Sequence, residues 1–167
     1  MIKAAFCDDD LSVLNELHVL MDNYRVERNQ EITYTAFHSP LELIAQIEKG
    51  MRFDILFLDV LMPGVNGIET AQEIREYDSA MKIIFLTSSA EYAVESYTVN
   101  AYFYQLKPIW PESFYRLMDS VLKECAQEQR RSLILRCKSG ITQISLDRLM
   151  YCEVQGRTLV FHMQNGE

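Results

Sequence analysis

The chain has 167 residues, of which 49% are hydrophobic and 24% charged, a composition typical of one globular domain, or of one domain and part of a second. No apolar run approaches the roughly 20 residues of a membrane helix, and no N-terminal segment has the pattern of a signal peptide, so we expect a cytoplasmic protein without a membrane partner. The net charge of −8 is uneven, since residues 1–125 contain 10 Lys+Arg against 20 Asp+Glu and residues 126–167 contain 6 against 4, and an acidic first part excludes nucleic acid as its direct ligand.

Five short apolar segments alternate with segments of helical periodicity in the first 125 residues. The predicted strands are Ile2–Cys7, Ile32–Phe37, Phe53–Leu58, Lys82–Leu86 and Ala101–Leu106. The predicted helices follow them: two begin at the capping boxes Ser39–Glu42 and Ser88–Glu91, and the last begins near Pro111. Strands that are apolar along their whole length are buried on both faces, so these five βα units predict an α/β domain with a doubly wound parallel sheet.

After the basic pair Arg130-Arg131 the pattern changes to strands alone. The predicted strands are Leu133–Cys137, Ile141–Leu146, Leu149–Val154 and Leu159–Met163, and the first two are joined by a turn at Lys138-Ser139-Gly140. We expect a linker over residues 126–132 and a β-only second domain over residues 133–167. So short a segment rarely folds alone, which predicts an incomplete domain that packs on the first or pairs with a second chain in a homodimer.

Polar residues end several of the predicted strands. Asp8, Asp9 and Asp10 end the first strand, Asp59 the third, Thr87 the fourth and Lys107 the fifth. In a doubly wound sheet these ends meet at the edge where ligands bind. Three consecutive aspartates also suit a solvated turn and an acidic helix start, but the joint placement favours an all-oxygen site for Mg²⁺, with Lys107 and Thr87 beside a transferred phosphoryl group.

The motifs at these strand ends resemble those of the CheY-like receiver domain of two-component response regulators. They are Cys7-Asp8-Asp9-Asp10, Asp59-Val60-Leu61-Met62-Pro63-Gly64, Leu86-Thr87-Ser88-Ser89 and Lys107-Pro108. They occur in the family's order and cover residues 1–125. The resemblance implies the flavodoxin-like strand order 2-1-3-4-5, a sensor histidine kinase as partner, and a regulator that is not a turnover enzyme.

The resemblance also implies a role for each site residue. Asp59 would be the phosphoacceptor, and Mg²⁺ would bind Asp9, Asp59, the backbone carbonyl of Leu61 and, through water, Asp8. Thr87 and Lys107 would hold the phosphoryl oxygens, Thr87 and Tyr104 would form the switch, and Pro108 would follow a cis peptide bond. Asp10 receives no ligand role.

A second resemblance concerns the output. Residues 92–109 are similar to receivers that precede LytTR-type DNA-binding domains, and residues 144–157 resemble the start of such a domain. This implies transcription regulation through DNA binding by the complete C-terminal domain, and within this chain only Arg157 is expected as a DNA contact.

Two other functions agree with parts of the sequence. An aspartyl-phosphate phosphotransferase of the haloacid dehalogenase type needs a second aspartate two positions after the nucleophile, where this chain has Leu61. A receiver that acts only through protein contacts remains open.

Overall fold

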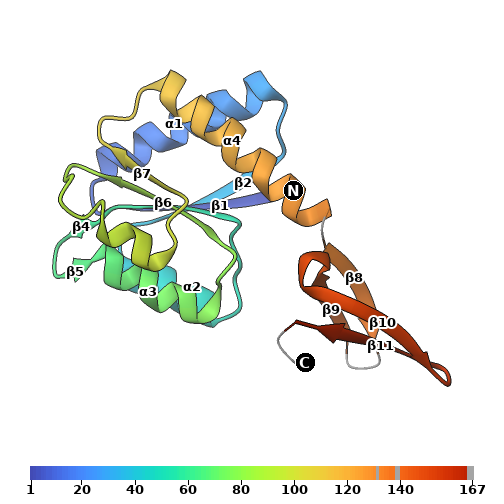
Figure 1. Ribbon diagram of the computed structural model, residues 1–167. Coiled ribbons are helices and arrows are strands. Elements are labelled where there is room, and N and C mark those ends of the chain that lie inside the picture. The colour runs from blue at the N-terminus through green and yellow to red at the C-terminus, as the bar shows by residue number, and fades with distance from the viewer. Residues whose placement is uncertain (131, 138–139, 165–167) are drawn as a thin grey trace. The chain divides into compact units, whose positions relative to one another are not determined.

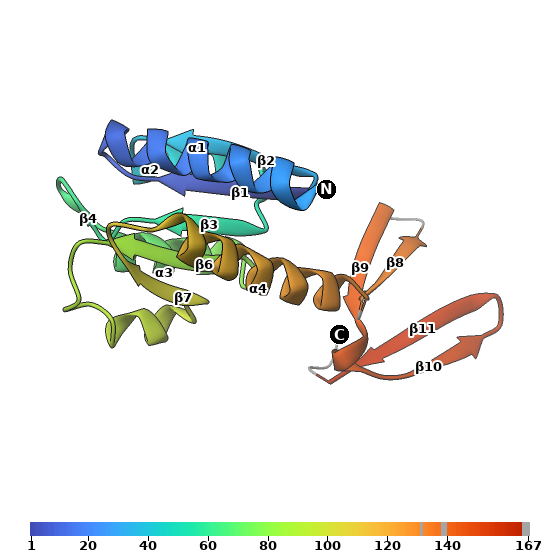
Figure 2. The ribbon, with the colours of Figure 1, turned by 90° about the horizontal axis from the view of Figure 1, so that it is seen from above.

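Five parallel strands form the central sheet in a computed structural model that describes residues 1–130, 132–137 and 140–164. Their order is β2-β1-β3-β6-β7 (Figures 1 and 2), which is 2-1-3-4-5 when only these strands are counted along the chain. The strands are β1 (Ile2–Cys7), β2 (Ile32–Phe37), β3 (Ile55–Leu58), β6 (Lys82–Thr87) and β7 (Phe103–Leu106). The predicted doubly wound fold is confirmed.

Helices cover both faces of this sheet (Figure 1). In that view α1 (Leu11–Arg28) and the first turns of α4 (Pro111–Arg130) lie on one face, and α2 (Pro40–Glu48) and α3 (Gly67–Tyr77) lie on the other. The four residues of β3 are buried, whereas the edge strand β2 is buried only at its two ends, and the four residues between them alternate exposed and half-buried. The sheet interior thus carries the continuous apolar runs that the sequence shows.

Local side-chain caps fix where three helices begin. Asp10, Ser39 and Asn66 each accept a hydrogen bond from a backbone N–H in the first turn of α1, α2 and α3, respectively. Asn66 belongs to a small hairpin formed by β4 (Leu61–Met62) and β5 (Val65–Asn66), which connects β3 to α3. These caps satisfy backbone donors that a helix N-terminus leaves free, and they hold the loops that follow β1 and β3.

The α-helix predicted after the Ser88–Glu91 capping box is wrong. The predicted capping box pairs Ser88 with Glu91, whereas here Ser89 Oγ accepts from the Glu91 N–H at 3.2 Å in a turn. Turns and the short 3₁₀ helix η1 (Glu95–Val99) follow it, and Asn100 ends the segment in the left-handed conformation with φ 54°. Val94, Thr98 and Val99 are β-branched and have low helix propensity, and the hydroxyl of Ser96 bonds to the Ala93 carbonyl at 2.7 Å.

The chain divides into two compact units, Met1–Leu117 and Met118–Glu167. Beyond α4 the second unit contains two antiparallel hairpins, β8–β9 and β10–β11, with the 3₁₀ helix η2 between them. The elements are β8 (Ser132–Cys137), β9 (Gly140–Ser145), η2 (Leu146–Arg148), β10 (Leu149–Gln155) and β11 (Thr158–Met163). The predicted turn residues Lys138 and Ser139, and Arg131 of the predicted linker, lie outside the described residues.

Candidate functional site

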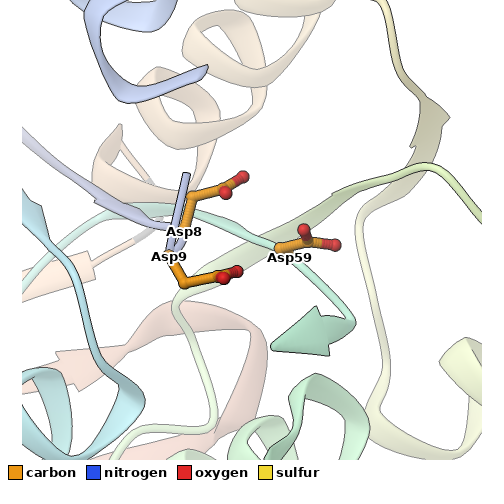
Figure 3. A group of neighbouring side chains, drawn as sticks. All are labelled: Asp8, Asp9 and Asp59. Carbon is orange, nitrogen blue, oxygen red and sulfur yellow. The ribbon is translucent and has the colours of Figure 1, made fainter. Parts of the chain in front are cut away.

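Three carboxylates meet where β1 and β3 end. Asp8 and Asp9 directly follow β1 and Asp59 directly follows β3, and one oxygen of each lies within 4.8 Å of the others. Figure 3 shows the three side chains directed into the same space. Asp8 and Asp59 are buried and Asp9 is exposed, so one carboxylate of the group is open to solvent and two are not.

Lys107, which directly follows β7, joins the two buried carboxylates. Its Nζ donates to Asp8 Oδ2 and to Asp59 Oδ2, each at 2.7 Å. Burial lowers the pKa of Lys107, but the hydrogen bonds to Asp59 and Asp8 outweigh it and leave the pKa raised. Burial raises the pKa of Asp8, and the Lys107 hydrogen bond opposes this rise. The lysine is therefore a permanent cation between two groups that could not both be buried as anions without it.

Backbone donors orient the remaining carboxylate oxygens. Asp8 Oδ1 accepts from the Asp10 N–H at 3.0 Å, and Asp59 Oδ1 accepts from the Leu61 N–H at 3.2 Å. The Asp10 side chain has a different role: its Oδ1 accepts from the Ser12 N–H at 2.8 Å and caps α1. The third aspartate of the run is thus engaged at the helix start and is not among the clustered carboxylates.

Thr87 and Tyr104 are connected through the backbone of Ser89. The fully buried Thr87 accepts a hydrogen bond at its Oγ1 from the Ser89 N–H at 3.4 Å, and Tyr104 donates from its hydroxyl to the Ser89 carbonyl at 2.6 Å. Burial, with the nearby Asp59 charge, raises the pKa of Tyr104. One residue therefore links the hydroxyl at the end of β6 to the aromatic side chain on β7.

The peptide bond between Lys107 and Pro108 is cis.

Gly67, the first residue of α3, was not identified from the sequence. Its N–H donates to the Val60 carbonyl at 2.8 Å. A Cβ at this position would lie 2.1 Å from the Asp59 carbonyl oxygen and 2.7 Å from Val60 Cα. The helix thus begins directly against the backbone of Asp59. The adjacent cap residue Asn66 marks a helix start, but nothing in the sequence indicates this close approach.

One residue that the sequence singled out belongs to the second compact unit. Arg157 is exposed in the second compact unit, in the tight turn between β10 and β11, where Gly156 has φ 64°. Its predicted role as a DNA contact is separate from the chemistry at the sheet edge.

Among the described residues, no helix has the length and apolar character required to span a bilayer.

The acidic group has the composition of a site for a hard divalent cation. Carboxylate oxygens from two loops are the ligands that Mg²⁺ prefers, and an ion with several bound waters needs only one or two of them. Lys107 supplies a further positive charge on the side of Asp59 and Asp8. An anionic group such as a phosphoryl group, placed between the lysine and a cation, would have its charge neutralised from both sides.

Comparison with known proteins identifies the family to which this chain is similar. The sequence pattern of the response regulator receiver domain matches residues 5–120. Sensory transduction protein LytT of Oceanobacillus iheyensis is 31% identical over 121 residues, covering 68% of this chain and 49% of LytT. Transcriptional regulatory protein NatR of Bacillus subtilis is 25% identical over 159 residues, covering 95% of this chain and 66% of NatR. The chain thus spans about half to two-thirds of the length of these relatives.

Solved structures agree on the fold. The response regulatory domain of protein mrkE from Klebsiella pneumoniae superposes with a TM-score of 0.67 at 23% sequence identity, covering 75% of this chain and 99% of that domain. The family match spans well over half of the chain and includes every clustered site residue. This chain belongs to the response regulator receiver domain family.

Proposed function

We propose that this chain is the receiver, with the first part of the output domain, of a response regulator that controls transcription, and that Asp59 accepts the phosphoryl group. One observation carries the proposal: Lys107 from the end of β7 contacts both Asp59 and Asp8 at 2.7 Å. This places a cation directly beside the carboxylate that would be phosphorylated. Burial of Asp59 excludes bulk water from that carboxylate, as a phosphoryl-transfer site requires.

The transfer would start from a phosphohistidine of a sensor kinase. An oxygen of the Asp59 carboxylate attacks phosphorus, the P–N bond breaks, and its electron pair stays with the donor imidazole, so that an acyl phosphate forms. Lys107 stays protonated because its pKa is raised, and its ammonium group neutralises charge on the phosphoryl oxygens. The Thr87 hydroxyl can turn from Ser89 to donate to one of them.

The same residues fit Mg²⁺. Asp9, Asp59 and the Leu61 carbonyl would hold it directly, and Asp8 through water; when bound, it would neutralise charge on the transferred group. Asp9 is exposed, so it can reorient toward an ion without breaking a buried contact. Asp8 and Asp59 each accept a backbone N–H at Oδ1 and the Lys107 ammonium at Oδ2, so both carboxylates are held in place beside the position where Mg²⁺ would bind.

The change at Asp59 would reach the surface through residues 90–101, here called the switch segment. A Thr87 hydroxyl drawn to the phosphoryl group would leave the Ser89 N–H without its acceptor, and the Ser89 carbonyl holds Tyr104. Added phosphoryl charge can bias such a two-state element. The receiver would in this way control a LytTR-type DNA-binding output, supported by the similarity to NatR over 95% of the chain and by the β-only hairpins of the second unit.

A small phosphodonor with Mg²⁺ tests the assignment. Intact-mass measurement should show one added phosphoryl group on the wild type and none on Asp59→Asn. Asp10→Asn is the matched control, because asparagine also caps a helix N-terminus and the variant removes one carboxylate of the same run without touching the cluster. Phosphate that remains on Asp59→Asn would refute the assignment.

The output needs a separate test, because the alternative is a receiver that acts through protein contacts alone. Arg157, exposed in the β10–β11 turn, is the proposed DNA contact in this chain. The chain of residues 1–167 should bind duplex DNA weakly and without sequence preference in a gel shift at moderate salt. Tight, sequence-selective binding that Arg157→Ala does not alter would show that this residue has been misassigned.

A further inference from the structure

Arg75, in the last turn of α3, donates four hydrogen bonds to backbone carbonyls of three segments. Its Nε donates to Val99 at 2.8 Å and its Nη2 to Asn100 at 3.1 Å. Its Nη1 donates to Asp78 at 3.1 Å and to Met81 at 2.8 Å. None of these four acceptors is a carboxylate, so the contacts are directed to the chain itself and not to a charge partner.

Three of the four acceptors lie where helices end, and the fourth, Met81, directly precedes β6. Asp78 is the C-terminal cap of α3, and Val99 and Asn100 are the last residue and the C-terminal cap of η1. The last carbonyls of a helix lack intrahelical donors and carry partial negative charge, which suits a cation. A planar guanidinium presents donors in several directions at once, which an ammonium on a flexible chain cannot reproduce. One side chain therefore satisfies the ends of two helices and the start of β6.

One residue at the end of the switch segment that Arg75 holds is part of the core. Val99 is 3% exposed and belongs to the same core cluster as Ile74, which precedes Arg75, and Met81, whose carbonyl accepts from Arg75. The Asn100 and Ala101 N–H groups donate to Tyr97 and Ser96 at 3.1 Å each. Exposure alone does not divide the segment, since Val94 is 78% and Tyr97 82% exposed. What distinguishes its C-terminal end is the pair of hydrogen bonds from Arg75 beside the buried Val99.

We propose that Arg75 anchors the C-terminal end of the switch segment to α3, so that the movement started by phosphorylation of Asp59 is confined to residues 88–95 and Tyr104. This inference rests on the proposed function, because it concerns the response to phosphorylation. Arg75 does not touch the reacting groups and is a positioning residue. It makes Asn100 the fixed end of the segment and leaves the residues that follow Thr87 free to rearrange.

Nuclear magnetic resonance of the full chain with Mg²⁺, with and without beryllofluoride, tests the anchor. In the wild type, the Tyr104 and residue 88–95 amides should shift while the Arg75 Nε–H and the Asn100 and Ala101 amides stay in place. In Arg75→Gln and Arg75→Lys, exchange of the Asn100 and Ala101 amides should be faster by about tenfold or more, and the beryllofluoride shifts should extend over residues 96–101.

Arg52→Gln is the matched control, because Arg52 Nη1 also bonds two carbonyls, those of Ile47 and Met51 at 3.1 Å, at the far end of α2. It should leave both readouts as in the wild type. Wild-type shifts at Asn100 as large as those at Tyr104, or Arg75 variants that respond as the wild type does, would overturn the anchor alone. Because the first of these results needs no variant, it decides the question even if Arg75→Gln does not fold. A chain in which beryllofluoride shifts nothing would remove the proposed function together with the anchor.

Discussion

Gly67→Ala should disturb the phosphorylation site from outside it. The added methyl group would lie 2.1 Å from the Asp59 carbonyl oxygen, more than 1 Å inside the roughly 3.3 Å at which carbon and carbonyl oxygen ordinarily meet. The obstacle is backbone, since the next atom is Val60 Cα at 2.7 Å, so no side chain can rotate away. Either the start of α3 or the Asp59–Val60 peptide must move by on the order of 1 Å.

Two energies oppose each other in this variant. Overpacking a close contact costs about 1–3 kcal/mol, whereas replacing glycine by alanine in a helix returns about 0.5–1 kcal/mol. The overlap with backbone places this site at the upper end of the first range, so we expect a net loss of about 2 kcal/mol in the free energy of unfolding. Displacement of Asp59 by this distance from Lys107 should also slow phosphorylation, by up to about a hundredfold.

Urea denaturation and the rate of phosphorylation by a small phosphodonor measure the two effects. Gly64→Ala serves as control: Gly64 has φ 76°, but a Cβ there meets nothing within 4 Å. It adds a methyl group nearby in sequence without the clash, and because its positive φ adds a strain that Gly67 does not have, a larger loss in Gly67→Ala is due to the clash. If Gly67→Ala unfolds at the urea concentration of the wild type and is phosphorylated as fast, the close approach of α3 to Asp59 does not position the site.

Three further predictions concern other parts of the site. Asp9→Ala should weaken Mg²⁺ binding at least tenfold by removing a direct oxygen ligand, and equal affinity in a titration monitored at the single tryptophan would count against that role. Tyr104→Phe removes the hydroxyl that donates to the Ser89 carbonyl at 2.6 Å; it should lower the free energy of unfolding by about 1 kcal/mol and reduce the beryllofluoride shifts in the switch segment, whereas unchanged shifts would exclude this bond from the switch. Burial, followed by the nearby Asp8 charge, raises the pKa of the Cys7 thiol from 9.0 to about 12, so the folded chain keeps a proton that the unfolded chain loses, and stability should fall by up to about 1.4 kcal/mol per pH unit above pH 9. Cys7→Ala should remove that slope, and an identical slope in the variant would show that another group causes it.

Much of this site follows from chain order alone. In a parallel sheet every strand that leaves the same edge delivers its next residue there, so Asp8, Asp59, Thr87 and Lys107 could be grouped from their positions after apolar segments. The apolar run Ile55–Leu58 that forms β3 could be predicted for a related reason: burial on both faces leaves no room for polar residues, and the strand begins only after Asp54. Where the sequence pattern is set by burial, it predicts both the strands and their meeting point.

The segment after Thr87 shows where such reasoning fails. A capping box marks where a helix can start, but it does not specify whether a helix follows; here Ser89, one residue after the predicted cap, accepts from the Glu91 N–H and turns follow. The β-branched residues Val94, Thr98 and Val99 weaken a helix locally. Tertiary contacts hold the end of the segment: Val99 enters the core cluster and Arg75 binds the carbonyls of Val99 and Asn100. No local signal in residues 88–101 reports those contacts.

Gly67 and Arg75 escaped prediction for a related reason. Neither is an acid, a nucleophile or a member of a cluster in the sequence, and each acts on backbone: Gly67 by lacking a Cβ against Asp59, Arg75 by donating to four carbonyls. Side-chain chemistry at strand ends can be inferred from residue types, because the fold brings those ends together. Backbone positioning depends on distances between segments that are remote in sequence. The residues that set the geometry of Asp59 and of the switch segment therefore became visible only in the folded chain.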